Sequence, residues 1–182
     1  MKKLLLHSCC GPCSTQVIDI LKNDYDLTIF YSNSNIFPQE EYEKRLAEQK
    51  RYAKIVGIDV IDDKYDEAEY LEFVKGLEKE KEGGLRCRAC FEFRLSRTAK
   101  FAKENGFDLF STTLTVSPHK NSEVINEIGN RISKEVGVDF LAGNFKKQDG
   151  YKKSIELSKR YNLYRQNYCG CRFSRWFENQ GE

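Results

Sequence analysis

The cysteines are the residues of this chain best suited to chemistry, because they fall in three tight clusters. The clusters are Cys9, Cys10 and Cys13; Cys87 and Cys90; and Cys169 and Cys171. Thiolates at such spacings can converge on metal. Seven is an odd number, so a framework in which every cysteine is paired in a disulfide is excluded. In a reducing compartment, clustered cysteines indicate metal or redox chemistry, and we expect a protein free of disulfides.

The seven cysteines divide into a set of four and a set of three. Four thiolates hold an iron–sulfur cluster of the [4Fe-4S] type, whereas three can hold one metal ion and leave a position vacant for substrate. Adjacent side chains diverge, so Cys9 and Cys10 could face different centres. The residues do not decide between Cys169 and Cys171. Our prediction is that the cluster is held by Cys10, Cys87, Cys90 and Cys171, and the single metal by Cys9, Cys13 and Cys169.

Two other interpretations of the cysteines are open. Residues 10–13, with the sequence CGPC, follow an apolar run and open a helical pattern, as the redox motif of thioredoxin-like dithiol oxidoreductases does. That interpretation leaves four clustered cysteines without a task. A non-catalytic RNA-binding module stabilised by zinc would use four thiolates in a closed tetrahedron and leave three unused.

Histidines could add a ligand or a proton donor. His7 ends the first apolar run, and His119 lies in a loop expected at the same edge of the fold. We count His119, with Cys9 and Cys13, among the candidate catalytic residues. The chain contains neither a G-x-x-x-x-G-K-[ST] nor a G-x-G-x-x-G motif, so nucleotide-cofactor binding has no support.

The elements that must position these residues alternate between strand and helix. Strands are predicted at residues 3–7, 27–32, 60–61, 109–114 and 140–142, and the main helices from residue 14, from 38 to 56 and from 122 to 136. This order predicts an open, mostly parallel, five-stranded α/β sheet with flanking helices. A helical insertion at about 67–105 carries one cysteine pair. Such sheets bind ligands at the carboxyl ends of their strands, where the first cysteine cluster falls.

Length and composition fit one domain spanning residues 1–182. The chain is 40% hydrophobic, enough for one sizeable core. No stretch approaches the roughly 20 apolar residues of a membrane span, so we expect no membrane association. The apolar run at the start is too short for a secretory signal. Together with the cysteine pattern, this predicts a cytoplasmic protein.

Charge is unevenly distributed although the net charge is only +2. Residues 38–82 hold 14 acidic and 9 basic residues, whereas residues 144–176 hold 2 acidic and 9 basic ones. The second stretch also carries seven aromatic residues, Trp176 among them. Basic residues interleaved with aromatics suit a polyanion whose bases can stack. The alternative is a solvated amphipathic helix whose lysine stems lie on apolar surface.

Three segments closely resemble the QueH family of epoxyqueuosine reductases. They are residues 7–14 (HSCCGPCS), 87–95 (CRACFEFRL) and 164–171 (YRQNYCGC), and residues 112–120 and 145–151 fit as well. The resemblance covers essentially the whole chain. It implies deoxygenation of an epoxide to an alkene on the modified wobble base of tRNA, the last step of queuosine synthesis. It also implies a [4Fe-4S] cluster beside a mononuclear iron, no cobalamin, and a fold akin to the PP-loop and HUP nucleotide-binding superfamily.

The resemblance also implies that the basic C-terminal segment binds tRNA. We expect the anticodon arm, with its modified base splayed from the stack, to lie against this segment. Phosphate contacts are expected from Lys146, Lys147, Lys152, Lys153 and Arg165, and base stacking from Tyr164 and Tyr168. Without a dinucleotide motif, electrons should come from an external donor such as a ferredoxin or flavodoxin.

Overall fold

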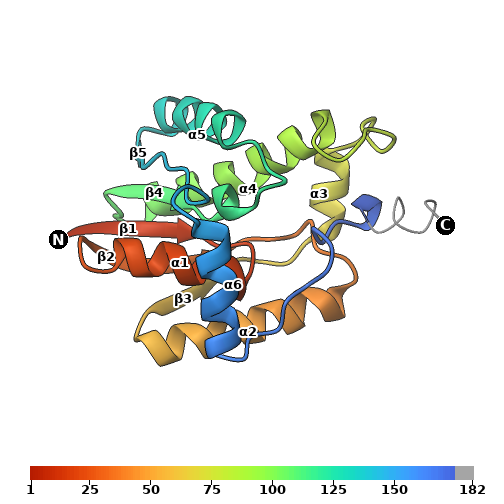
Figure 1. The fold of residues 1–182 in the computed structure, drawn as a ribbon. Coiled ribbons are helices and arrows are strands. Elements are labelled where there is room, and N and C mark those ends of the chain that lie inside the picture. Colours follow the sequence, from red (N-terminus) through yellow and green to blue (C-terminus); the bar gives the residue numbers. More distant parts are fainter. Residues whose placement is uncertain (175–182) are drawn as a thin grey trace.

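A central sheet organises the molecule, and the computed structural model describes it within residues 1–174. Its strands are β1 (Lys2–His7), β2 (Tyr25–Tyr31), β3 (Asp59–Asp62), β4 (Leu109–Thr112) and β5 (Asp139–Phe140). They pair in the order β3-β2-β1-β4-β5, and every pairing is parallel (Figure 1). The predicted open five-stranded α/β sheet is therefore confirmed, and it is wholly rather than mostly parallel.

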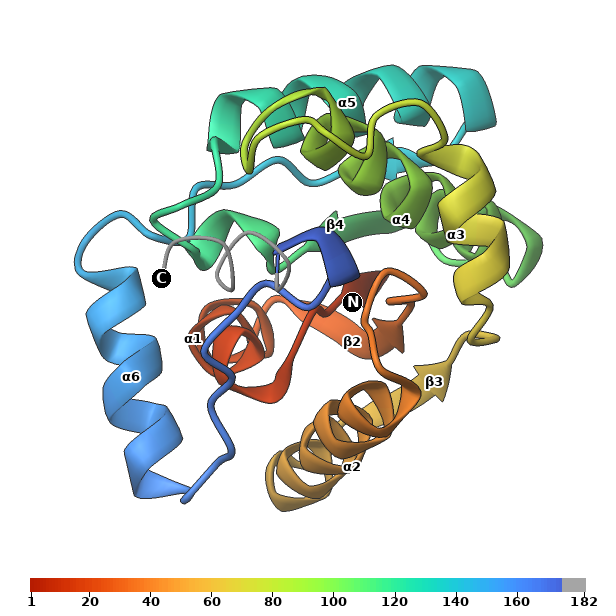
Figure 2. The same cartoon turned by 90° about the vertical axis from the view of Figure 1, so that its right-hand side faces the viewer.

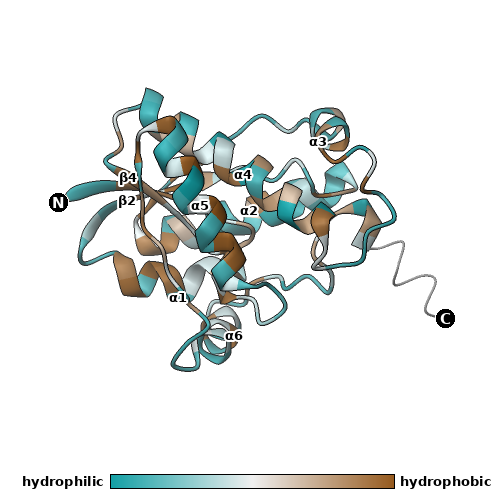
Figure 3. Ribbon diagram, turned by 90° about the horizontal axis from the view of Figure 1, so that it is seen from above, coloured by the Kyte–Doolittle hydropathy of each residue, from teal (hydrophilic) through white to brown (hydrophobic). Residues whose placement is uncertain are grey.

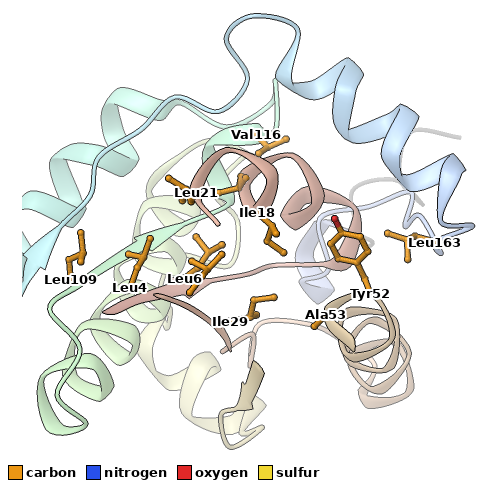
Figure 4. Packing of buried hydrophobic residues seen from close by; sticks show 12 residues of the cluster. Leu4, Leu6, Ile18, Leu21, Ile29, Tyr52, Ala53, Leu109, Val116 and Leu163 are labelled. Atoms are coloured by element: carbon orange, nitrogen blue, oxygen red, sulfur yellow. The ribbon is translucent and has the colours of Figure 1, made fainter. Parts of the chain in front are cut away.

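The side chains of β1 point alternately to the two faces of the sheet, and the core therefore has two layers. Leu4 and Leu6 pack with α1 (Gly11–Leu21) and α2 (Gln39–Val56) on one face (Figure 4). Leu5 points the opposite way and packs with α4 (Leu85–Glu104) and α5 (Ser122–Val136). Because successive side chains of a strand face opposite sides, one apolar run fills both layers. The brown, hydrophobic colouring of the strands beneath the helices follows this arrangement (Figure 3).

Three shorter elements complete the described chain. α3 (Glu67–Phe73) precedes α4, the 3-10 helix η1 (Leu114–Val116) follows β4, and α6 (Gly150–Arg160) packs along α1. Two helix starts are capped by side chains: Asn121 accepts hydrogen bonds at the start of α5, and Asp66 does so at α3. In residues 1–174, no helix combines the length and apolarity required to cross a membrane.

The carboxyl ends of the strands form the edge that matters for function. Figure 2 looks onto this edge, with the C-terminal arm, residues 161–174, crossing the middle of the view in dark blue. The loops that follow β1 and β4 meet here, as the parallel topology requires. All seven cysteines are free thiols, and the arrangement of the three clusters around this edge sets the site.

Candidate metal centre

The first cysteine cluster is a compact triad at the start of α1. The Sγ atoms of Cys9, Cys10 and Cys13 all lie within 4.8 Å of one another, and those of Cys9 and Cys10 are 3.9 Å apart. Hydrogen bonds from the Cys10 and Cys13 thiols lower the pKa of Cys9, so the triad favours at least one thiolate. The positive end of the α1 dipole favours the same charge state.

Polar contacts beneath the triad fix the turn from β1 into α1. The Ser8 hydroxyl lies 3.1 Å from the Cys10 carbonyl oxygen and 2.6 Å from Oε1 of Gln49 on α2. The Asn33 side chain donates to the Ser8 carbonyl at 2.7 Å. All of these groups are buried, so the turn is held from both sides before any ligand binds.

The other four cysteines form a second group, which lines a cavity. Cys87 and Cys90 lie in the first turns of α4, Cys169 and Cys171 lie on the C-terminal arm, and all four line one cavity of about 300 Å³. Backbone N–H groups already point at two of the sulfurs: Gly83 N is 3.2 Å from Cys87 Sγ, and Ser174 N is 3.3 Å from Cys171 Sγ. Burial raises the pKa of Cys90, and raises that of Cys171 to about 12. A metal would be needed to deprotonate such thiols.

This geometry favours a division of the cysteines that differs from the one expected from sequence. Cys10 groups with Cys9 and Cys13, and Cys169 shares the second cavity with Cys87, Cys90 and Cys171. Divergence of adjacent side chains holds for a continuous strand, but the chain turns into a helix at Cys10, and the turn brings both sulfurs together. Cys169 also borders the larger cavity beside the triad. It therefore lies between the two groups.

Arg45 of α2 positions the arm that carries Cys169 and Cys171. Its side chain, 1% exposed, donates to the carbonyl oxygens of Cys169 at 3.0 Å and Tyr168 at 3.1 Å, and pairs with Glu41. Gly170, between the two cysteines, adopts a φ of +125°. A Cβ there would stand 2.9 Å from an Arg45 nitrogen and 3.0 Å from Ile36. The glycine is therefore required by backbone conformation and by space.

Two cations between the cysteine groups were not assigned a role from the sequence. Arg94 is 2% exposed and borders both cavities. Among the described residues, its Nε and Nη2 atoms have no hydrogen-bond partner. Lys120 also borders both cavities. Burial alone would lower the pKa of Lys120, but the negative charges of Cys169, Cys9 and Cys13 raise it. The only sign in the sequence that Arg94 and Lys120 could be functional was that both lie in segments that resemble the QueH family.

The two histidines have different environments. His7 is completely buried, with Nδ1 2.9 Å from the Thr112 hydroxyl and Nε2 3.1 Å from the Ser32 carbonyl oxygen. Burial lowers its pKa to about 4, so it is a neutral structural residue joining three strands. His119 is exposed and borders both cavities, so it is the histidine that could meet a substrate.

The larger cavity, of about 440 Å³, lies beside the triad and can admit a modified base. Its wall combines Cys9 and Cys13 with Arg165, Gln166 and Tyr168 of the arm. The Gln166 Oε1 atom is buried and has no hydrogen-bond partner within residues 1–174. Buried polar atoms usually have a hydrogen-bond partner, so this oxygen is a candidate contact for a ligand.

The residues proposed to contact tRNA fall into two sets. Lys147, Lys152, Lys153 and Arg165 are exposed on or near α6. The other three are engaged within the protein. Lys146 donates to the carbonyls of Ser117 and Lys120, and Tyr164 bonds Glu41.

Tyr168, the third engaged residue, lies 2.7 Å from the Phe37 carbonyl oxygen through its hydroxyl. The two tyrosines thus hold the arm against α2 and against Phe37, just before that helix. Trp176, also noted in the basic segment, lies outside the described residues.

The fold and site together define an α/β protein with a cysteine-lined candidate metal centre at the carboxyl edge of its sheet. The sequence model of the family described as "Epoxyqueuosine reductase QueH" matches residues 4–176. Named relatives agree. The epoxyqueuosine reductase QueH of Streptococcus pyogenes is 42% identical over 92% of this chain and 68% of its own length. That of Thermotoga maritima is 38% identical over 96% of this chain and 91% of its own. The chain belongs to the epoxyqueuosine reductase QueH family, and it is an oxidoreductase.

A solved structure is similar in fold. It is the crystal structure of a predicted subunit of a tRNA methyltransferase from Methanocaldococcus jannaschii, with a TM-score of 0.62 over 100% of this chain and 89% of that one. At 13% sequence identity the likeness concerns the fold alone. The open parallel α/β architecture is therefore shared with that protein.

Gly170→Ala should reduce metal loading because it strains the arm at the point where two ligands are carried. The added Cβ meets Arg45 and Ile36, and the positive φ costs about 1–3 kcal/mol for other residues. Gly57→Ala is the matched control, since Gly57 also has a positive φ but no atoms within 4 Å of a Cβ. Iron and acid-labile sulfide should fall in the first variant only. Equal losses in both would show that general destabilisation, not the arm, is responsible.

Proposed function

We propose that this protein removes the epoxide oxygen of epoxyqueuosine at the wobble position of tRNA, giving queuosine. The observation that carries the proposal is the convergence of seven cysteines, as a group of three and a group of four, around adjoining cavities at the sheet edge. The reaction breaks two C–O bonds and forms one C=C bond. It consumes two electrons and two protons and releases water.

The donor sets fit the two metal centres that the family resemblance implies. Cys87, Cys90, Cys169 and Cys171 would hold a [4Fe-4S] cluster, and Cys9, Cys10 and Cys13 a mononuclear iron with an open position. The buried, unpartnered nitrogens of Arg94 fit an anionic centre between the two groups. When bound, the cluster would supply electrons and the single iron Lewis acidity. A zinc-stabilised module would leave three cysteines without a role, and a thioredoxin-like enzyme would leave the four cysteines of the other two clusters without one.

The chain's own groups would handle the oxygen and its protons. The Lys120 ammonium faces Cys9 and Cys13, so it can donate a hydrogen bond to oxygen held beside the triad. His119, on the same loop, is exposed and can relay a proton from solvent. Gln166 would orient the base through its free carbonyl oxygen.

Binding of tRNA would rest on the exposed cations of α6 and the arm. Lys147, Lys152, Lys153 and Arg165 offer phosphate contacts beside the larger cavity, which Arg165 lines. Electrons would come from a ferredoxin or flavodoxin in a reducing cytoplasm. The direct test is single-turnover reduction of epoxyqueuosine tRNA by anaerobically reconstituted, chemically reduced protein, and failure with full iron and sulfide content would refute the proposal.

The division of cysteines can be tested by comparing Cys10→Ala with Cys87→Ala. If Cys10 belongs to the triad, its loss should lower iron while acid-labile sulfide stays near the wild-type level. Cys87→Ala should lose both, because one of four cluster ligands is gone. Iron, sulfide and the cluster's visible absorption after anaerobic reconstitution provide the measurement. Loss of sulfide in Cys10→Ala would restore the division first expected from the sequence.

Lys120→Met should slow reduction by about 10²-fold, the usual effect of removing one donor to a developing negative charge. Binding of tRNA and metal content should persist, and Lys120→Arg should recover part of the rate because it keeps the cation. The rate of the His119→Gln variant in the same assay provides the comparison with loss of the neighbouring histidine. If Lys120→Met reduces the substrate at the wild-type rate in single turnover, Lys120 does not act on the oxygen.

Affinity for tRNA should weaken steeply with salt if the exposed cations bind phosphates. Each of Lys147→Ala, Lys152→Ala and Lys153→Ala should lower the slope of log K against log salt by about 0.7–0.9. Lys146→Ala should instead disturb the Ser117–Lys120 loop. Exposed Lys54 on α2 is the control position. An affinity that does not change with salt would contradict this surface.

A further inference from the structure

One acidic residue, Glu82, lines both cavities of the site. These are the cavity beside the triad and the cavity of the four-cysteine group. Glu82 is the only carboxylate among the described residues that line either of them. The larger cavity also carries four cations, Arg45, Arg94, Lys120 and Arg165.

The position of Glu82 is set by the loop that precedes α4. Buried Arg86 donates to the carbonyl oxygens of Glu78 at 3.1 Å and Glu80 at 2.5 Å, and Gly84 N bonds the Lys81 carbonyl at 3.0 Å. The next residue, Gly83, points its N–H at Cys87 Sγ. The backbone on both sides of Glu82 is therefore anchored. Its carboxylate forms no hydrogen bond or ion pair with any residue in the range 1–174.

An unpaired carboxylate at this place opposes the main electrostatic character of the site. Polyanionic RNA is attracted by the cations around the cavity and repelled by Glu82. A carboxylate that lines a cavity with four cations could pair with one of them, yet Glu82 is exposed and pairs with none of the described residues. Its chemistry suits a ligand group that is cationic.

Epoxyqueuosine carries one such group. Its cyclopentane ring is joined to the 7-deazaguanine through a methylene and a secondary amine, and such an amine is protonated near neutral pH. We infer that Glu82 is a specificity residue that pairs with this ammonium group, and the inference rests on the function proposed above. Glu82 would hold the linker at the junction of the two cavities, so that the epoxide ring lies toward the cysteines and the base toward the arm.

The test compares RNA binding by wild-type protein and Glu82→Gln, which keeps shape and removes charge. Three anticodon stem-loops are used, with guanine, 7-aminomethyl-7-deazaguanine or epoxyqueuosine at the wobble position. The wild-type protein should prefer the two amine-bearing loops, and Glu82→Gln should lose about five-fold of that preference, as for a partly exposed ion pair. Its affinity for the guanine loop should stay equal or rise, because a repulsive charge is gone.

The controls separate this inference from the proposed function. Glu127→Gln, an equal charge change at an exposed position of α5, should leave the preference intact, and iron content should match in all proteins. Equal loss of affinity for all three loops would overturn the inference, since Glu82 would then read the guanine edge or support the loop. An unchanged preference would overturn it too. If wild-type protein with full metal content fails to reduce epoxyqueuosine RNA, the proposed function itself fails.

Discussion

The negative charge of clustered sulfurs is the constraint on which the rest of the site depends. Thiolates in a partly buried region repel one another, and the effect is stronger than in water because the effective dielectric constant is lower. Arg94 and Lys120 lie between the two cysteine groups and supply the compensating charge, and each has its pKa raised by facing sulfurs despite burial. A buried guanidinium with two unpartnered nitrogens is unfavourable in isolation. It becomes favourable once the sulfurs, or a metal centre built on them, are anionic.

The parallel sheet brings together cysteines that lie far apart in the sequence. The triad follows β1 directly at its carboxyl end, whereas the other two cysteine pairs lie far along the chain. The α4 pair is brought over the edge because α4 packs across β1 and β4, with Phe91 and Leu95 anchoring it beside Leu5. The arm has no strand or long helix of its own at the cysteines. It depends on Arg45 and on the hydrogen bond from Phe37 N to the Gly170 carbonyl.

Sequence patterns predicted the fold well because those patterns are local. The apolar run at residues 4–6 is read directly as a buried parallel strand, and the helical pattern predicted α1 from residue 14, three residues after its start at Gly11. The location of the first cysteine cluster followed from topology alone. The grouping of Cys10 did not, because it depends on the backbone turn at the helix start. The placement of Lys120 and Arg94 beside the cysteines was also missed, since a cation in a motif does not reveal which residues from other segments will surround it.

In the function proposed above, metal ligation and RNA binding would depend on one short arm. Residues 164–168 line the larger cavity or hold the arm in place, and the candidate ligands Cys169 and Cys171 follow directly. Tyr164 and Tyr168 fix the arm to α2 through Glu41 and the Phe37 carbonyl, so they set the position of the cysteines as much as the shape of the cavity. A force applied to the arm by bound RNA would act on Cys169, which borders both cavities. In the proposed function, the modified base and the metal centre would therefore be positioned by the same few contacts, and neither could shift without the other.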